Sequence, residues 1–355
     1  MAALIIFNIV VSIKQFSENR RLSEQAAAKA ASLEKIELPA EYAKGDAELP
    51  NFYIFFFDEL AGTKCMKEVF DYDNTGFYNE MRGLGFAVSD KCTNYRHFTY
   101  ETLSGLFNMD YVFSYEDDGA FACQEQFWNA RFFSLMQEMG YSLHERNTAC
   151  SVDFEPRFRY DTSKEPSETE DGYTTSEVIL RRSLFAPLAE AIGVFPSEYY
   201  LINNVLNYYS HPENYKYKNA LTYTNICCPH APFLFDINGS LVDEANRMNW
   251  ADPKYFTEQY AYICKRITDT MKNVIKNDPG SIIVVFSDHG VKQNKYLWNG
   301  PSVTTEQSTD TFFAVYTGGR NDLGDITGLS GANVLRAILN KEYGFHLDMT
   351  GPPTE

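Results

Sequence analysis

The segment SIIVVFSDHG, residues 281–290, decides the fold of this chain. Its β-branched and aromatic residues form a continuous apolar run that is too short for a typical helix, so the run predicts a buried strand. The strand ends in a carboxylate and an imidazole, Asp288 and His289, followed by Gly290, which lets the chain turn. In open α/β sheets, ligands bind outside the carboxyl ends of the strands. These side chains are suited to bind a metal ion, although a turn with a capping aspartate explains the tripeptide equally well.

A second segment, NFYIFFFDE at residues 51–59, has the same organisation. It is continuously apolar and stops at an acid, Asp58. Because buried parallel strands end at one edge of a sheet, we expect the carboxylates of Asp58 and Asp288 to lie near each other. A divalent cation at that edge would relieve their mutual repulsion. The alternative is that both acids only cap turns.

The chain has 355 residues and 15% aromatic content, enough to build a sizeable core in one large α/β domain or two domains. Its net charge of −17 argues against a nucleic-acid backbone as partner, which requires a basic face. An anionic substrate stays open, because a bound metal ion can invert the local field. Seven cysteines cannot all pair within the chain, and no pair has the CxxC spacing of a zinc site.

The N-terminal segment Met1–Ile13 is apolar but shorter than the roughly 20 residues that span a bilayer. We expect residues 1–14 to be the remnant of a transmembrane helix, with an ordinary packed helix as the alternative. Residues 15–48 are predicted to form a helical connector and linker. The cations Lys14, Arg20 and Arg21 follow the apolar segment, and the positive-inside tendency would hold the next part of the chain in the cytoplasm.

Predicted strands and helices alternate along the rest of the chain, which indicates an α/β fold with a largely parallel sheet. Besides the two segments above, we expect strands at residues 85–88, 141–143, 220–227 and 311–316. We expect helices at residues 127–139, 175–191, 197–209, 253–277 and 331–339, an acidic surface insertion at 154–171 and a polar loop at 292–309.

Two further residues are candidates for chemistry. In NYRHFTYETLSGLFNM, residues 94–109, a helix is predicted to begin near Thr99. A hydroxyl there faces free N–H groups and a positive dipole end, which suits a cap and also a nucleophile beside a phosphate or sulfate. His230 lies between prolines in CPHAPF, residues 228–233, so the sequence predicts that it is rigidly presented at a sheet edge. The alternative for His230 is a hydrogen-bonded loop residue.

The order of Asp58, Thr99, His230 and Asp288-His289 resembles the sulfatase-like branch of the alkaline phosphatase superfamily. More narrowly, it is similar to the membrane-anchored group of lipoteichoic acid synthases, phosphoglycerol transferases and phosphoethanolamine transferases. The resemblance covers residues 49–355 as one catalytic domain. It rests on the motifs PNFYIFFFDE, NYRHFTYETLSGLFNMDYV, PHAPFLFDING, FSDHG, FFAVY and ANVLRAILN in this order.

The resemblance implies a three-layer α/β/α sandwich with a threonine nucleophile, Thr99, that is bound to a divalent metal ion, Mn²⁺, Mg²⁺ or Zn²⁺. Asp58, Asp288 and His289 match the other metal ligands, and several relatives carry glutamate where this chain has Asp58. His230 matches a histidine that contacts the transferred group or the leaving oxygen.

A substrate contact is also implied at Trp128 and Arg131, which resemble a Trp-Asn-Arg motif of lipoteichoic acid synthases. Ala130 intervenes in this chain and displaces the arginine by one position. An arginine on the face of a helix is therefore the alternative for Arg131.

The implied function is a transferase or hydrolase that acts on phosphoglycerol- or phosphoethanolamine-type phosphodiesters through a covalent phospho-threonine. Its substrate would be a phospholipid or glycan of the cell envelope, and its catalytic domain would be membrane-anchored and extracytoplasmic. One alternative is a sulfatase in which Cys92 becomes formylglycine, because residues 92–96 have the spacing of the arylsulfatase Cys-x-Pro-x-Arg motif without its proline. Thr102 as nucleophile, and an inactive metal-binding recognition module, are the others.

Overall fold

The computed structural model describes residues 2–42, 48–147, 198–292, 303–320 and 323–352. The helix predicted at 175–191 and the insertion at 154–171 lie outside the described residues, as does the loop at 293–302. The elements are α1 (Ala2–Ala31), β1 (Phe52–Phe57), α2 (Thr63–Phe70), α3 (Thr75–Gly83), β2 (Ala87–Thr93), α4 (Thr99–Asn108), α5 (Gly119–Trp128), α6 (Arg131–Glu138), β3 (Ser142–Asn147), α9 (Glu198–Tyr208), η1 (Pro212–Tyr215), β4 (Ala220–Ile226), η2 (Glu244–Asn246), α10 (Pro253–Asn277), β5 (Ile282–Phe286), α11 (Thr305–Ser308), β6 (Asp310–Tyr316) and α12 (Gly331–Tyr343).

The strands form one sheet in the order β2-β6-β5-β1-β4-β3. β1 pairs in parallel with both β4 and β5, and β3 pairs in parallel with β4. β6 runs antiparallel to β5 and to β2, so β2 has the same direction as the parallel strands. This confirms the predicted α/β fold with a largely parallel sheet, and it places the carboxyl ends of β1, β2, β4 and β5 at one edge.

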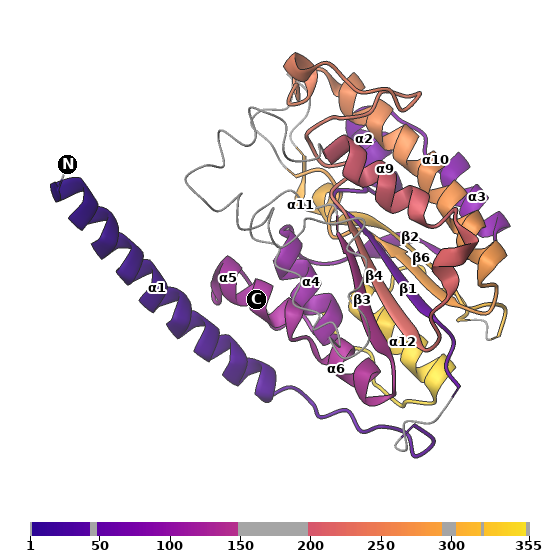
Figure 1. The fold of residues 1–355 in the computed structure, drawn as a ribbon, viewed down its shortest axis with the longest axis horizontal. Coiled ribbons are helices and arrows are strands. Elements are labelled where there is room, and N and C mark those ends of the chain that lie inside the picture. Colours follow the sequence, from indigo (N-terminus) through magenta and orange to yellow (C-terminus); the bar gives the residue numbers. More distant parts are fainter. Residues whose placement is uncertain (1, 43–47, 148–197, 293–302, 321–322, 353–355) are drawn as a thin grey trace.

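Helices cover both faces of the sheet and make three layers (Figure 1). The core on one face includes side chains of α2, α3, α9 and α10, and the core on the other includes side chains of α4, α6 and α12. Successive side chains of β1 alternate between the two cores, with Phe55 in one and Phe56 in the other. Burial of each such side chain contributes about 1.5–3 kcal/mol. The continuous apolar run of β1 in the sequence therefore reflects burial on both faces.

The helix predicted at residues 127–139 is wrong as one element, because α5 ends at Trp128 and α6 begins at Arg131. Between them Ala130 has an extended backbone, with φ −62° and ψ 140°, which interrupts the helical hydrogen-bond ladder. The backbone N–H of Arg131 donates to Asn108 Oδ1 at 3.3 Å instead. A contact with a distant helix thus fixes a break that the local apolar periodicity does not reveal.

α1 is one continuous helix that contains both the predicted transmembrane remnant and the first part of the predicted connector. Its C-terminal part packs on the segment around α5, where Ala26 is buried against Phe113 and Cys123. Lys29 Nζ lies 2.7 Å from Asp118 Oδ2 and donates to the carbonyl of Val112 at 3.0 Å. Among the helices that the structure describes, none is both long and apolar enough to span a membrane.

The turn after β5 is packed tightly against the start of β6, and Gly290 is the point of closest approach. Its N–H donates to the carbonyl of Ser308 at 2.7 Å. A Cβ atom at this position would lie 2.6 Å from the carbonyl oxygen of Gln307 and 2.8 Å from that of Asp310. The glycine is therefore required for space rather than for a positive φ, which this residue does not have.

We predict that Gly290→Ala destabilises the fold, because backbone atoms rather than a flexible side chain would have to move. The expected loss is about 1–3 kcal/mol in the free energy of unfolding, measured by urea denaturation. Gly76→Ala in α3 is the matched control, since a Cβ there would meet no atom within 4 Å. Equal stability of the two variants would contradict the close packing of this turn.

Candidate functional site

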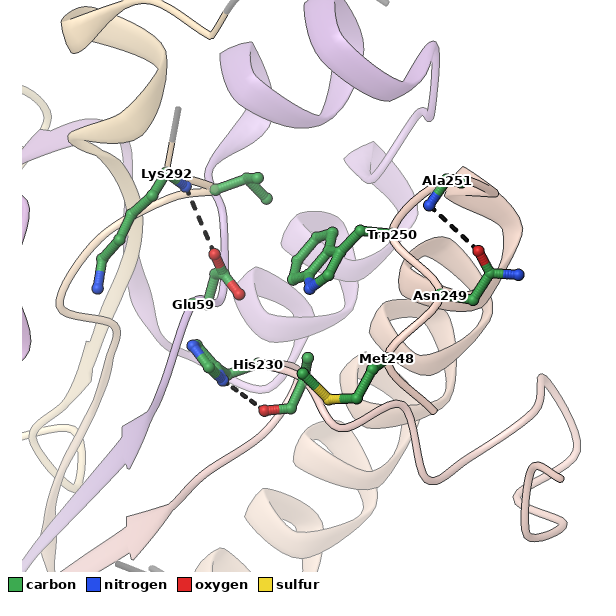
Figure 2. A pocket seen from close by; sticks show the side chains of 9 residues that line it. Glu59, His230, Met248, Asn249, Trp250, Ala251 and Lys292 are labelled. Atoms are coloured by element: carbon green, nitrogen blue, oxygen red, sulfur yellow. Dashed lines mark hydrogen bonds between the residues drawn. The ribbon is translucent and has the colours of Figure 1, made fainter. Parts of the chain in front are cut away.

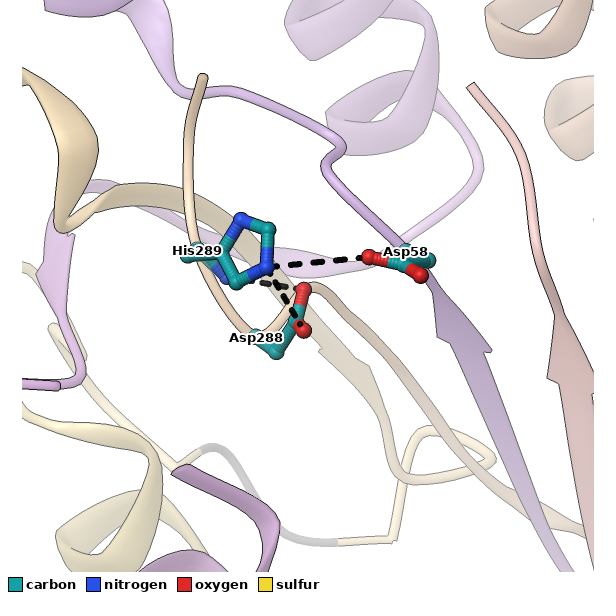
Figure 3. A group of neighbouring side chains, drawn as sticks. All are labelled: Asp58, Asp288 and His289. Atoms are coloured by element: carbon teal, nitrogen blue, oxygen red, sulfur yellow. Dashed lines mark hydrogen bonds and ion pairs between the residues drawn. The ribbon is translucent and has the colours of Figure 1, made fainter. Parts of the chain in front are cut away.

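Three side chains from the ends of neighbouring strands converge at the carboxyl edge of the sheet. Asp58 directly follows β1, and Asp288 and His289 follow β5 after one intervening residue. His289 Nε2 lies 3.1 Å from Asp288 Oδ2 and 3.7 Å from Asp58 Oδ1 (Figure 3). One ligand atom from each residue lies within 4.8 Å of the other two. The structure thus brings together the three residues that the sequence predicts as metal ligands.

The unsatisfied atoms of this cluster fit a bound metal ion. Asp58 Oδ1, Asp288 Oδ2 and His289 Nε2 are buried and have no hydrogen-bond partner. Such atoms are normally satisfied in folded proteins. Carboxylate oxygens together with an imidazole nitrogen are ligands for Zn²⁺ and Mn²⁺, and carboxylates also suit Mg²⁺. The donor set therefore matches the divalent ions that the resemblance implies.

Neighbouring groups orient these ligands. His289 Nδ1 lies 2.8 Å from the carbonyl oxygen of Gly290, so Nδ1 carries the proton and the lone pair of Nε2 faces the cluster. Asp288 Oδ1 accepts from the N–H of His289 at 2.8 Å and from the N–H of Glu59 at 3.3 Å, which leaves Oδ2 for the cluster. Burial lowers the pKa of His289 to about 4, although Asp288 opposes this shift. The imidazole is therefore neutral at pH 7, the form that binds metals.

The carboxyl group of Asp58 has the opposite shift. Burial raises the pKa of Asp58 to about 7, and the nearby charge of Asp288 adds to the rise. Two carboxylates in one buried cluster repel each other, so the ionised form of Asp58 is disfavoured. A cation between them removes that penalty, as the sequence predicts.

Thr99 is the first residue of α4 and follows β2 at the same edge of the sheet. The start of the predicted helix is confirmed. The N-cap position is taken by Phe98, which has an extended backbone and makes no side-chain cap hydrogen bond, so Thr99 is not the cap residue. Its half-buried hydroxyl lies in the first turn of a helix, where the positive dipole end favours an anion.

The loop before Thr99 is tied to the metal-binding turn. The buried amide of Asn94 donates to the carbonyl oxygens of Ser287 at 2.8 Å and Asp288 at 3.1 Å. His97 Nδ1 lies 2.8 Å from Ser308 Oγ, on α11. These contacts fix the entrance of α4 relative to the ligands of β5. The sequence shows Asn94 only as part of a motif, because its partners lie almost 200 positions further along the chain.

His230 also reaches this edge, from the loop after β4. Its N–H donates to the carbonyl oxygen of Asp58 at 3.1 Å, and its Nδ1 lies 2.5 Å from the carbonyl oxygen of Ala231. Burial by itself lowers the pKa of His230, but the carboxylates of Asp58 and Glu59 raise it to about 9. His230 is therefore a cation at neutral pH in the absence of metal, and it can donate a proton or bind an anion.

The structure does not bring Trp128 and Arg131 to this edge. The side chain of Arg131 donates to the carbonyl oxygen of Asn108, at the C-terminal end of α4, and to that of Glu34 at 2.8 Å. That end lies about 14 Å from Thr99 along the helix. Trp128 packs on Phe127 in the core, with ring centroids 4.6 Å apart. The implied substrate contact is not supported, and Arg131 instead joins α4 to the connector.

The competing nucleophiles are placed less favourably than Thr99. Cys92 lies within β2, is 1% exposed, and belongs to the apolar core. Burial raises the pKa of its thiol to about 12. Thr102 is fully buried one turn further into α4.

A cavity of about 480 Å³ adjoins the cluster (Figure 2). Its walls combine charged, aromatic and small apolar side chains: Glu59, His230, Ala231, Met248, Asn249, Trp250, Ala251, Val291 and Lys292. It shares His230 with the predicted site, and Glu59 is the chain neighbour of Asp58. Apart from His230, the sequence analysis did not single out these side chains. The one available signal was a second acid directly after Asp58.

No family model matches the chain, and no curated protein matches it. Solved structures do match. The C-terminal periplasmic domain of EcEptC from Escherichia coli, in complex with Zn, aligns with a TM-score of 0.51 and 10% identity over 86% of this chain and 85% of that chain. The soluble domain of lipooligosaccharide phosphoethanolamine transferase A from Neisseria meningitidis aligns with a TM-score of 0.50 and 12% identity over 86% and 89%. A putative sulfatase from Bacteroides fragilis aligns with a TM-score of 0.49 and 12% identity over 82% and 73%.

These similarities show that the chain has the fold of the sulfatase-like branch of the alkaline phosphatase superfamily, as the order of the motifs predicts. At 10–12% identity they establish the fold alone. The residues that carry the chemistry have to be argued from the site itself.

We predict that the chain binds one divalent ion in a pH-dependent way through these ligands. Asp58 must lose its proton to bind metal, and its pKa is about 7. Below pH 7 the affinity should therefore fall by about tenfold per pH unit, and above pH 7 it should level off. Calorimetric titration of the metal-free protein with Zn²⁺ or Mn²⁺ between pH 5.5 and 8.5 measures this profile.

Asp288→Asn should abolish that binding, because the amide supplies no negative charge to the cluster. Asp243→Asn, in an exposed position without a side-chain cap hydrogen bond, is the matched control and should bind as the wild type does. Undiminished binding by Asp288→Asn would rule out the proposed ligand set.

Proposed function

We propose that this chain is a metal-dependent enzyme that transfers or hydrolyses a phosphodiester-linked head group through a covalent phospho-threonine at Thr99. The observation that carries the proposal is the convergence of three buried, unsatisfied ligand atoms of Asp58, Asp288 and His289 at one sheet edge. The proposal is supported by the fold, which is shared with a domain solved in complex with Zn and with the soluble domain of a phosphoethanolamine transferase.

Asp58, Asp288 and His289 would hold the metal ion, with the hydroxyl of Thr99 as a fourth ligand. The bound ion supplies Lewis-acid chemistry, which stabilises negative charge on oxygen and activates a poorly nucleophilic hydroxyl. Asp58 is one methylene shorter than the glutamate of several relatives, so it would favour a more closely held ion at this position.

The residues of the chain divide the remaining work. The N-terminus of α4 orients the anionic phosphoryl group, since its amides and dipole favour negative charge. The oxygen of Thr99 forms a bond to phosphorus, and the bond from phosphorus to the leaving alcohol breaks, while the threonine proton passes to solvent. The imidazolium of His230 gives a proton to the leaving oxygen.

The second step reverses these roles. Water or a glycan hydroxyl attacks the phosphorus, and the bond from phosphorus to Thr99 breaks. Neutral His230 takes up the proton of the incoming hydroxyl, and Thr99 regains a proton from solvent. His230 is suited to both roles because its charge depends on the carboxylates of Asp58 and Glu59 beside it.

We further propose that the N-terminal segment attaches the domain to a membrane, outside the cytoplasm, where lipid and glycan substrates are available. Residues 1–14 are apolar in sequence, and the side chains of Ile13 and Phe16 on α1 are 63% and 72% exposed. Exposed apolar side chains on a helix suit an apolar surrounding. The similar domain of EcEptC is described as periplasmic.

Removal of residues 1–14 should abolish cosedimentation of the protein with phospholipid vesicles. The contacts of α1 with α5 involve residues 22–30 and are retained, so the shortened chain should still fold and bind metal. Equal sedimentation of the two chains would refute the membrane assignment.

Thr99→Ala should lower phosphodiester turnover by at least about a thousandfold, because the nucleophile is lost. Metal binding should persist through the three other ligands. Thr102→Ala is the matched control and should keep most of the activity, since its hydroxyl is fully buried away from the entrance of α4. Turnover of phosphodiester and sulfate esters is measured with added Mn²⁺, Mg²⁺ or Zn²⁺.

The same assay distinguishes the alternatives. Near-normal turnover by Thr99→Ala would exclude the phospho-threonine mechanism. Turnover confined to sulfate esters would point to a sulfatase, and metal binding without any turnover would point to a recognition module.

A further inference from the structure

The carboxylate of Glu59 is buried without adequate partners, next to the site of the proposed function. Glu59 follows Asp58 with a φ of 64°, a left-handed conformation that non-glycine residues rarely adopt. Its side chain is 3% exposed. Oε1 accepts one long hydrogen bond, from the N–H of Lys292 at 3.4 Å, and Oε2 accepts none. A buried carboxylate in this condition carries a large desolvation penalty, so its retention calls for a ligand.

The two cations near Glu59 do not satisfy Oε2. The ammonium group of Lys292 lies 5.3 Å from the ring centroid of Phe98, beside the start of α4. Figure 2 shows the lysine side chain pointing away from the Glu59 carboxylate, although the lysine backbone is bonded to it. His230 lines the same cavity, but its ring contacts the carbonyl of Ala231 and forms no hydrogen bond with Oε2. The free oxygen therefore faces a cavity that is otherwise largely apolar.

An aromatic wall stands in this cavity together with the carboxylate. The indole of Trp250 is held by two other rings, Phe233 with centroids 4.8 Å apart and Phe256 with centroids 5.7 Å apart. The remaining lining includes Ala231 and Val291. A rigid indole face attracts cations, and most strongly where water is excluded. A carboxylate and an indole in an apolar cavity form a recognised arrangement for ammonium groups.

We propose that this cavity is a subsite for a positively charged group on the substrate, a primary or quaternary ammonium, with Glu59 as the specificity-determining residue and Trp250 as its aromatic wall. The proposal rests on the proposed function and deepens it. Lys292 separates two regions of opposite sign, since its ammonium lies toward α4 and its backbone lies against Glu59. A zwitterionic head group, with a phosphate and an amine a few bonds apart, matches this arrangement, whereas a neutral glycerol head group leaves Glu59 unpaired.

The test is calorimetric binding of free head groups to the full chain with Mn²⁺ bound, which requires no turnover. The probes are O-phosphoethanolamine, phosphocholine and sn-glycerol 3-phosphate. The wild type should bind O-phosphoethanolamine at least about tenfold more tightly than glycerol 3-phosphate. Glu59→Gln should reduce this ratio to about one, and its affinity for glycerol 3-phosphate should stay within about twofold of the wild-type value.

Two other variants complete the experiment. Trp250→Leu should weaken phosphocholine by about fivefold relative to glycerol 3-phosphate. Glu244→Gln, an exposed acid outside the cavity, is the matched control and should leave all affinities unchanged.

Equal affinity of the wild type for the amine-bearing and neutral probes would overturn the proposal, whatever the variants do. An equal loss of both kinds of probe in Glu59→Gln would also overturn it, because that pattern indicates a role in folding or metal binding. Full activity of Thr99→Ala, by contrast, would refute the proposed mechanism and leave this head-group preference as a separate measurement.

Discussion

The repulsion and desolvation of Asp58 and Asp288 at one end of the sheet form the constraint on which the site depends. The parallel pairing of β1 with β5 forces both acids to the same edge. Burial then disfavours their charges and also keeps His289 neutral, as the raised pKa of Asp58 and the lowered pKa of His289 indicate. Each of these effects is unfavourable in the protein alone and becomes favourable when a cation joins the three ligand atoms. The cluster is therefore best understood as a binding site for a divalent ion.

The groups around the cluster are satisfied, which makes the unsatisfied atoms informative. Ser287 Oγ accepts from the N–H of Leu60 at 2.8 Å and donates to the carbonyl oxygen of His289 at 3.1 Å. Asn94 joins the loop before α4 to the same turn through two hydrogen bonds. Buried polar networks of this kind hold side chains in fixed positions. Against this background, the open atoms of Asp58, Asp288, His289 and Glu59 mark where ligands are expected, rather than a loosely packed region.

Sequence patterns predicted the parts of the structure that local chemistry determines. The apolar runs before Asp58 and Asp288 gave two buried strands, and a strand end is visible in sequence as the point where the run stops. Other features depend on contacts between distant segments and leave no local signal. The break at Ala130 is fixed by Asn108 of α4, and Arg131 is directed to the connector by the carbonyl of Glu34. Glu59 and Trp250 are almost 200 residues apart, so no pattern along the chain indicates that they line one cavity.

The aromatic residues of β1 have a role beyond burial, because they fix the spacing of the metal ligands. Phe56 of β1 is the register partner of Phe286 of β5, and their rings stack with centroids 5.3 Å apart. Asp58 and Asp288 each lie two positions after this pair, so the register of the pair sets the register of the acids. A slip of one residue would shift Asp58 by about 3.3 Å along the strand and would turn every side chain of β1 to the opposite face. The two cores cannot accommodate that exchange without rebuilding, so the hydrophobic packing on both sides of the sheet holds two repelling carboxylates at the separation that one ion can bridge.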